Sequence, residues 1–332
     1  MTTEWTGEGI LERMRGYQFA CMVGAAAELD LYQALSEEPR TAEALAERIQ
    51  ADGRGTRILA DGLVALELLV KEDDRYRLAD GVAPLLVGTV PGSVLAMVRH
   101  QMNGLRRWGR LAEVVRLGRP PERQASVRGD ESDEWAFIEA MHVVSQPVAA
   151  AVVSGLGSGP FARILDVGAG PATWTIAFLE AHPTARATVY DLPHVIPMAR
   201  RHVEESGLLD RVTFVSGDFE ADTELPGGMD VVWISAIAHM NSREQNRALL
   251  GKAHAALVEG GEVMIRGIVM EPSHTIPAAG AIFAVNMLSG TPGGDTYTLE
   301  ETTADLAASG FGPPTVIPGP RDMDTVLRST RT

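Results

Sequence analysis

The segment from Ile164 to Thr175, ILDVGAGPATWT, constrains the fold of this chain more than any other. An apolar run ends in an aspartate, two glycines follow, and a helical pattern begins after them. This order predicts a buried strand, a tight turn and a helix N-terminus, the arrangement that holds nucleotide-like ligands. Glycine suits such a turn because it has no Cβ, so that the backbone can approach a ligand closely. The segment therefore predicts an α/β fold with a ligand site at Gly168 and Gly170.

The residues of the turn discriminate between possible ligands. The dinucleotide fingerprint G-x-G-x-x-G would need a glycine at position 173, where the chain has Thr173. Asp166 places a carboxylate at the end of the strand, which suits the ammonium group of a methionine moiety and would repel a pyrophosphate. The turn therefore favours S-adenosylmethionine. A glycine-rich bend is a weak signal alone, since any strand-turn-helix segment can contain one.

Polar residues at the ends of further predicted strands support this interpretation. Asp191, followed by Leu192, ends a β-rich run at about 20 residues from the glycine turn, the spacing expected of a ribose-binding carboxylate. Asp218 and Phe219 end the next strand and could bind an adenine amine and stack on its ring. A fourth strand ends at Ser235. Because helical stretches separate these strands, we expect a mostly parallel sheet that collects these residues at its carboxyl edge.

These segments together resemble a known family. The motifs DLPHVI, GDF, IAH and NML, with two Gly-Gly pairs, match it at residues 191–196, 217–219, 237–239, 286–288, 260–261 and 293–294. The chain resembles the S-adenosylmethionine-dependent O-methyltransferases of plant and bacterial secondary metabolism. The resemblance covers nearly the whole chain. It implies a Rossmann-like class I methyltransferase sheet, an N-terminal winged-helix dimerisation domain, and methyl transfer to a hydroxyl of a small aromatic or polyketide-like acceptor.

The resemblance also assigns roles to residues. His239 matches the catalytic histidine of the family, and its ordinary pKa near 6.5 suits a base that takes a hydroxyl proton. We expect the cofactor to be bound by Asp166, Gly168, Gly170, Asp191, Leu192, Asp218, Phe219 and Ser235. The candidate acceptor-pocket residues, for which core packing is an equally good explanation, are Phe137, Met141, His142, Asn286 and Met287.

The surroundings of this histidine depart from the family pattern. Plant members hold the histidine between two glutamates, whereas this chain has Gly267 and Thr296 at the aligned positions. The family's aspartate and tryptophan after the histidine are also replaced, by Met240 and Asn241. A base without an acidic partner is less well fixed in position and tautomer. The sequence does not choose among the possible substitutes, which are Asp295, Tyr297, Asn286 and His142.

Alternative functions therefore stay open. One is a C- or N-methyltransferase, for example one that acts on a 2-oxo acid with a metal near His239. No recognisable ligand spacing supports a metal, and we predict none. Another is a non-methylating enzyme that keeps the cofactor as a scaffold.

The first hundred residues have a different pattern. We expect helices over residues 10–35, 41–49 and 55–70 and a hairpin over 71–78, which is a winged-helix order. A DNA-binding role is disfavoured because Arg40 to Arg77 contains seven basic and eight acidic side chains. The resemblance implies a dimerisation module instead. We predict domains at 1–105 (dimerisation), 106–150 (linker and pocket helices) and 151–332 (S-adenosylmethionine binding).

Composition restricts the cellular setting. The formal charge of −15 argues against general nucleic-acid affinity. Cys21, the one cysteine in the sequence, cannot form an internal disulfide, which fits the reducing cytoplasm. We find no signal peptide and no run of about 18 uncharged apolar residues that would span a membrane. The expectation is a cytoplasmic homodimer whose partner molecule is a small acceptor, with no role for nucleic acid or a membrane.

Overall fold

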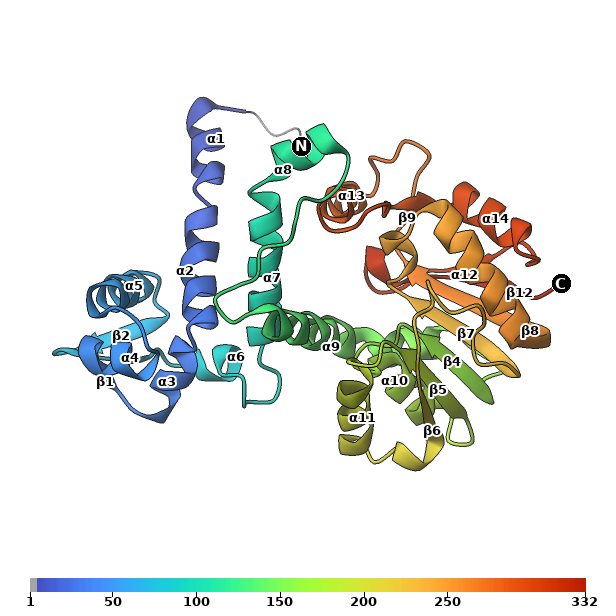
Figure 1. The fold of residues 1–332 in the computed structure, drawn as a ribbon, viewed down its shortest axis with the longest axis horizontal. Coiled ribbons are helices and arrows are strands. Elements are labelled where there is room, and N and C mark those ends of the chain that lie inside the picture. The colour runs from blue at the N-terminus through green and yellow to red at the C-terminus, as the bar shows by residue number, and fades with distance from the viewer. Residues whose placement is uncertain (1–4) are drawn as a thin grey trace. The chain divides into compact units, whose positions relative to one another are not determined.

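The computed structural model describes residues 5–332, and its backbone contacts divide the chain into two compact units (Figure 1). The smaller unit contains the chain up to Arg106 together with residues 124–143, and the larger unit contains residues 107–123 and 144–332. Two helices contribute to both units, α7 (Leu95–Trp108) and α9 (Asp130–Gly155). Each unit has an apolar core of its own.

The smaller unit is mainly helical and contains a small antiparallel sheet. Its other elements are α1 (Gly7–Met14), α2 (Tyr17–Glu28), α3 (Leu31–Glu37), β1 (Arg40–Thr41), α4 (Ala42–Arg48), α5 (Gly53–Ala65), β2 (Leu69–Glu72), β3 (Arg75–Leu78) and α6 (Ala83–Leu86). The predicted hairpin is present as β2 and β3, with Asp73 left-handed in its turn (φ 55°), and β1 pairs with β3 as a third strand. Thr41 caps α4 by accepting a hydrogen bond from the Ala44 N–H. These elements confirm the predicted winged-helix order.

Two helices of this unit end earlier than predicted. The apolar run over residues 10–35 forms three helices instead of one, because the chain turns at Gly16 and again at Asp30, which is left-handed with φ of 58°. The helix predicted over residues 55–70 ends before Glu67, which is also left-handed (φ 60°). Apolar side chains continue across each break, so that hydrophobic periodicity alone could not locate it.

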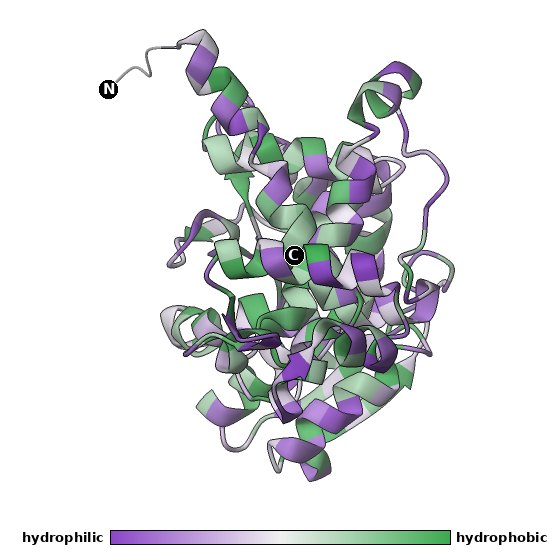
Figure 2. Cartoon of the chain, turned by 90° about the vertical axis from the view of Figure 1, so that its left-hand side faces the viewer, coloured by the Kyte–Doolittle hydropathy of each residue, from purple (hydrophilic) through white to green (hydrophobic). Residues whose placement is uncertain are grey.

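The first two helices expose large apolar side chains. In the single chain Met14, Tyr17 and Phe19 have exposed fractions of 66%, 56% and 54%. The helix that follows the N-terminal trace has green as well as purple turns in the hydropathy colouring (Figure 2). Surface of this kind is typical of a contact with another protein chain.

A seven-stranded sheet forms the centre of the larger unit. Its strands are β4 (Arg163–Val167), β5 (Arg186–Asp191), β6 (Val212–Ser216), β7 (Met229–Ser235), β8 (Leu257–Gly267), β11 (Thr315–Ile317) and β12 (Thr325–Thr330). The order across the sheet is β11-β12-β8-β7-β4-β5-β6, and the strands from β8 to β6 are parallel. Only β12 is antiparallel to both of its neighbours, β8 and β11. This topology confirms the predicted class I methyltransferase sheet, and it contains one reversed strand, β12.

Helices cover both faces of this sheet (Figure 1). They are α10 (Thr173–Ala181), α11 (Ile196–Glu205), α12 (Arg243–Ala256) and α14 (Leu299–Ala308). α10 and the end of α9 pack on the face that contains Trp233, while α12 and α14 pack on the face that contains Ile234. Neighbouring residues of a strand point to opposite faces, so that an unbroken apolar strand such as β7 supplies both cores. The strand order reverses at β4, where β5 and β7 lie on either side, and ligands of such sheets bind beyond the carboxyl ends of the strands at this point.

Short elements complete the larger unit. These are α8 (Leu111–Leu117), the 3₁₀ turns η1 (Leu209–Arg211), η2 (Ala238–Met240) and η3 (Asp322–Asp324), α13 (Ala278–Gly290), β9 (Val269–Met270) and β10 (Tyr297–Thr298).

The expectation that no segment of the chain could span a membrane is not met by the helix α9. It has 26 residues and is long and apolar enough to do so by length and composition. One such helix is weak evidence, because the core helix of a soluble protein passes the same test. In α9, 39% of the most apolar window is buried within the structure.

The aromatic cluster on the α10 face gives a prediction for stability. Phe178 is fully buried, with ring centroids 5.1 Å from Trp233 and 5.6 Å from Phe161. Phe178→Ala should lower the free energy of unfolding by about 3–5 kcal/mol, because it removes apolar contacts and leaves a cavity. Urea denaturation measures the change. Val316→Ala, at a 42% exposed position on β11, should change it by less than about 0.5 kcal/mol, and an equally small effect at Phe178 would contradict this packing.

Candidate active site

The glycine turn follows β4 and adopts the conformation that its sequence requires. Gly168, Gly170 and Ala172 all have positive φ angles, of 65°, 54° and 58°. A Cβ at Gly168 would lie 2.6 Å from the Cδ1 of Ile237, so packing requires glycine there. A Cβ at Gly170 would have no atom within 4 Å. The turn is therefore tightly packed at its first glycine and open at its second, where a ligand can approach the backbone.

Asp191, at the end of β5, fixes this turn. One carboxylate oxygen accepts a hydrogen bond from the Gly170 N–H at 2.7 Å, and the other accepts one from the Leu192 N–H at 2.7 Å. Burial raises the pKa of Asp191, and these two backbone donors act against that rise. The hydrogen bond from Gly170 to Asp191 thereby brings together two residues that were predicted to bind the cofactor. Each carboxylate oxygen of Asp191 keeps a lone pair for a ligand hydroxyl.

Asp166 lies beneath the same turn. Its side chain is almost fully buried and accepts a hydrogen bond from the Thr175 hydroxyl at 2.7 Å. Burial raises its pKa to about 7, and the nearby Asp191 adds to this rise. The structure thus shows Asp166 supporting the start of α10, and its predicted contact with a ligand ammonium stays a prediction.

The segment that contains Asp218 and Phe219 is held by residues that the sequence analysis did not identify. The Asp222 carboxylate accepts hydrogen bonds from the Tyr190 hydroxyl at 2.6 Å and from the Asp218 N–H at 3.2 Å. The Lys252 ammonium donates to the Phe219 carbonyl at 2.8 Å. The Phe219 ring lies beside the glycine turn, since its Cε1 would be 3.8 Å from a Cβ at Gly168. An aromatic ring therefore lies next to the turn, on the side of its first glycine.

Ser235 ends β7 and contacts a charged residue that sequence analysis also missed. Its hydroxyl accepts a hydrogen bond from Arg266, on the neighbouring strand β8, at 3.0 Å. Arg266 is only 3% exposed. A charged residue inside the otherwise apolar run VMIR was the signal that could have revealed it, because buried charges are rare and need partners.

His239 lies in η2, directly beyond β7, at the carboxyl edge of the sheet. Its ring makes an edge-on contact with Phe283 of α13, with centroids 4.8 Å apart. Desolvation and, as the smaller cause, the charge of Arg266 lower its pKa to about 4. Within residues 5–332 the imidazole nitrogens make no hydrogen bond, so that no orienting partner replaces the missing glutamates.

The candidate orienting partners are bonded elsewhere. The Tyr297 hydroxyl donates to the Asn241 carbonyl at 2.5 Å, and Asp295 accepts from the backbone N–H of Thr296. Asn286 accepts a hydrogen bond from the Trp108 indole N–H at 3.1 Å. His142 belongs to the smaller unit.

The predicted acceptor-pocket residues are divided between the units. Asn286 and Met287 lie on α13 in the larger unit, and the bond from Trp108 leaves the amide NH₂ of Asn286 as the group available to a ligand. Phe137, Met141 and His142 lie on the part of α9 that belongs to the smaller unit. Trp108 is a further residue that sequence analysis did not assign, and its place in a run of arginines concealed it.

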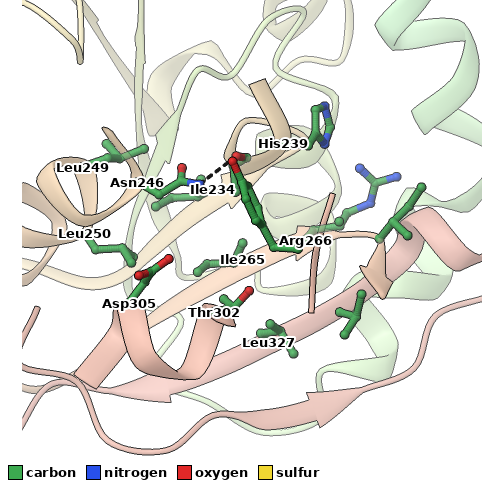
Figure 3. Close-up of a pocket in the computed structure, with 15 residues that line it drawn as sticks. Ile234, His239, Asn246, Leu249, Leu250, Ile265, Arg266, Thr302, Asp305 and Leu327 are labelled. Carbon is green, nitrogen blue, oxygen red and sulfur yellow. Dashed lines mark hydrogen bonds between the residues drawn. The ribbon is translucent and has the colours of Figure 1, made fainter. Parts of the chain in front are cut away.

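A small cavity lies between the sheet and the helices α12 and α14. Figure 3 shows His239 and Arg266 toward one end of it and Leu250 and Asp305 toward the other. Its volume of about 50 Å³ is enough for a few water molecules. Pockets for drug-sized ligands are several times larger, so this cavity is not a pocket for an aromatic acceptor. Across residues 5–332 there is also no cluster of three or more His, Cys, Asp or Glu side chains that could hold a metal.

Comparisons with known proteins agree with this architecture. Residues 108–312 match the model of the O-methyltransferase domain, and residues 11–87 match that of the O-methyltransferase dimerisation domain. The chain belongs to the O-methyltransferase family. Members of this family take the methyl group from S-adenosylmethionine, so the recognition, the fold class, the enzyme class and the cofactor predicted from sequence are confirmed.

Individual relatives show the range of this O-methyltransferase family. The chain is 32% identical to the 3-hydroxy-5-methyl-1-naphthoate 3-O-methyltransferase of Streptomyces sahachiroi, over 86% of this chain and 84% of that protein. It is 29% identical to the L-tyrosine C(3)-methyltransferase of Streptomyces lavendulae, over 93% and 87%. The solved structure of the mitomycin 7-O-methyltransferase MmcR has a TM-score of 0.82 at 25% identity, with 98% of this chain and 97% of that chain covered.

The site of this methyltransferase fits its cofactor. The open space at Gly170 and the aromatic ring of Phe219 beside the turn provide room and a stacking surface. The Asp191 carboxylate, already fixed by two backbone donors, is placed to accept hydrogen bonds from a sugar. Nothing in the turn itself is positively charged, as suits a ligand that carries a sulfonium.

The raised pKa of Asp166 predicts how stability changes with pH. The folded state binds the proton of the Asp166 carboxyl more tightly than the unfolded chain does. The contribution of this proton to the free energy of unfolding is therefore full below the ordinary pKa of 3.8 and is lost as the pH rises through about 7. Asp166→Asn cannot ionise and keeps an acceptor for Thr175. The variant should therefore gain stability relative to wild type between about pH 4 and pH 7, by up to about 4 kcal/mol.

Urea denaturation across this pH range measures the difference. Asp210→Asn, at an exposed position in the same unit, serves as the matched control and should follow wild type. A difference between Asp166→Asn and wild type that does not change with pH would contradict the assignment of the raised pKa to this carboxyl.

Proposed function

We propose that this methyltransferase transfers the methyl group of S-adenosylmethionine to a hydroxyl group of a small aromatic or polyketide-like metabolite. The observation that carries the proposal is the position of His239, a half-buried imidazole at the carboxyl edge of the sheet beside Phe283, whose lowered pKa keeps it neutral at pH 7. The relatives named for 3-O-methylation of a hydroxynaphthoate and 7-O-methylation in the mitomycin series support a hydroxyl acceptor.

The residues divide the work as follows. S-adenosylmethionine supplies a methyl group activated by a sulfonium, and Asp191, Leu192, the glycine turn and Phe219 hold this cofactor. His239 accepts the acceptor's hydroxyl proton on a free ring nitrogen as the oxygen–methyl bond forms. Asn286, fixed by Trp108, donates a hydrogen bond to a polar group of the acceptor. Positioning of this kind can supply much of the rate enhancement of a two-substrate reaction.

Carbon methylation is the second candidate, because a relative at 29% identity is named as a tyrosine C(3)-methyltransferase. A phenol methylated at carbon also loses a proton, which His239 can accept. The two candidates differ only in the atom that receives the methyl group, and product analysis separates them.

We further propose that the active protein is a cytoplasmic homodimer. The dimerisation domain at residues 11–87 and the exposed apolar side chains of α1 and α2 support the dimer. The single cysteine, which cannot form an internal disulfide, is consistent with the cytoplasm. In this proposal residues 1–105 form the dimer contact, residues 106–150 contribute to the acceptor pocket, and residues 151–332 bind the cofactor.

The decisive experiment measures release of S-adenosylhomocysteine from the purified protein with S-adenosylmethionine and a panel of phenols, hydroxyquinones, hydroxynaphthoates and 2-oxo acids. Mass spectrometry and NMR then locate the added methyl group. An O-methyl aromatic product is expected. Turnover that yields only C- or N-methyl products, or turnover of 2-oxo acids alone, would overturn the proposal.

The base role of His239 predicts a selective loss of rate. His239→Ala should bind S-adenosylmethionine as wild type does but turn over about 10²- to 10⁴-fold more slowly, because the proton has no acceptor. Calorimetry and single-turnover kinetics measure the two effects. Phe283→Leu, which changes the ring beside the base without removing the proton acceptor, should retain most of the rate. Wild-type turnover in His239→Ala would eliminate the base role.

The proposed ribose-binding role of Asp191 predicts a loss of cofactor binding, in contrast to the loss of rate predicted for His239→Ala. Asp191→Ala removes the acceptor of two backbone bonds and of the cofactor hydroxyls, and should weaken cofactor binding about 10- to 100-fold. Titration calorimetry with S-adenosylhomocysteine measures it without any acceptor. Glu220→Ala, which removes an exposed acid near the same edge, is the control and should bind normally. Unchanged affinity in Asp191→Ala would remove the ribose assignment.

A further inference from the structure

His239 lies in a turn that is too short to fix its own shape. The 3₁₀ turn η2 consists of three residues. Its backbone bonds run from the Met240 N–H to the Ile237 carbonyl at 2.8 Å and from the Asn241 N–H to the Ala238 carbonyl at 3.4 Å. A single turn of this kind is stable only when other elements hold it. The position of the imidazole therefore depends on the contacts that η2 makes with the rest of the unit.

Asn246, near the start of α12, bonds to residues on both sides of His239. Its amide NH₂ donates to the Ala238 carbonyl at 2.8 Å, a bond that is drawn as a dashed line in Figure 3. Its amide oxygen accepts a hydrogen bond from the Asn241 side chain at 3.2 Å. Ala238 directly precedes the histidine, and Asn241 follows it by two residues. One side chain thus bridges the turn, and it uses both the donor and the acceptor of its amide.

The surroundings make this bridge rigid. Asn246 and Asn241 are both buried, with exposed fractions of 7% and 2%, so that water competes little for their hydrogen bonds. A buried polar group that loses its partner is destabilised by its full desolvation cost, which favours keeping both bonds. The start of α12 is itself fixed by a capping box between Ser242 and Gln245. Asn246 therefore ties η2 to an element that is fixed in place.

Two further contacts hold the same turn. The Tyr297 hydroxyl donates to the Asn241 carbonyl at 2.5 Å. A Cβ at Gly294 would collide with the His239 carbonyl oxygen and would lie 2.9 Å from that of Met240, so that the backbone at Gly294 packs directly on η2. These contacts all reach the main chain or the neighbours of the histidine. Across residues 5–332 none is a hydrogen bond to the imidazole, so the ring is placed by the backbone that bears it.

We propose that Asn246 is the positioning residue for His239: its two hydrogen bonds fix the backbone on both sides of the histidine and so set where the imidazole lies against Phe283. An acidic partner would act on the ring itself, whereas Asn246 acts through the main chain. The inference rests on the proposed base role for its effect on turnover. Its effect on the position of the ring is independent of that role.

Asn246→Leu tests this positioning, because leucine is similar in size and makes neither hydrogen bond. Turnover should fall about 10- to 100-fold, since a displacement of about 1 Å at a reacting group can cost that much. Single-turnover kinetics at saturating cofactor and acceptor measures the rate. Calorimetry with S-adenosylhomocysteine should give an affinity within about threefold of wild type, because a positioning residue acts on the rate and not on cofactor binding. Ala248→Leu, at an exposed position of the same helix, is the control and should match wild type in both.

The position of the imidazole also has a readout that does not depend on turnover. The ring centroids of His239 and Phe283 lie 4.8 Å apart, so NMR should detect a nuclear Overhauser effect between their ring protons in wild type. Asn246→Leu should weaken or abolish this effect. If Asn246→Leu does not fold, Asn246→Ala replaces it. The cavity beside Asn246 has room for a water molecule, which can satisfy the freed Ala238 carbonyl without tying it to α12.

A double-variant cycle separates positioning from a general structural role. If Asn246 acts through His239, Asn246→Leu should cause no further loss of turnover in a His239→Ala background. An equal loss in both backgrounds, an unchanged ring contact in the folded variant, or a loss of S-adenosylhomocysteine affinity that matches the loss of turnover would overturn the inference and leave the proposed function intact. Wild-type turnover in His239→Ala would overturn the base role instead, and the ring contact would still decide whether Asn246 positions the imidazole.

Discussion

The hydrogen bond from the Gly170 N–H to the Asp191 carboxylate is the interaction on which the site depends. It connects the turn after β4 to the end of β5, so that two strands fix the shape of one loop. The loop in turn sets the start of α10 and the position of Trp174, which lies against Arg266. The shape of the glycine turn and the start of a core helix are therefore coupled through a single backbone donor.

Much of the fold could be predicted from local sequence because its strands are apolar runs that end in polar residues. Apolar runs that end in Asp166, Asp191 and Ser235 predicted three strands, and the structure aligns all three in one sheet. The helix caps at Thr41 and Ser242 were also predictable, since a capping side chain bonds only to backbone a few residues away. The break at Asp30 was not, because a left-handed residue leaves no trace in an apolar pattern.

The site was less predictable than the fold because its contacts join distant parts of the chain. Position and motif predicted His239 and Asp191 as site residues. The bonds from Trp108 to Asn286 and from Arg266 to Asp324 connect residues far apart in sequence, and no local pattern predicts such pairs. The loss of the glutamates at Gly267 and Thr296 was visible in the sequence, whereas the burial of Arg266, one residue before Gly267, was not.

The reversed strand β12 has a consequence for how the protein is made. Asp324, the counter-ion of Arg266, directly precedes this strand, and β12 inserts between β8 and β11. While residues 324–330 are still being synthesised, a nascent chain has its glycine turn and His239 but leaves Arg266 without its carboxylate and β8 with an open edge, which invites wrong pairing. Arg266 and the edge of β8 therefore gain their native partners only in chains that have been translated past this strand.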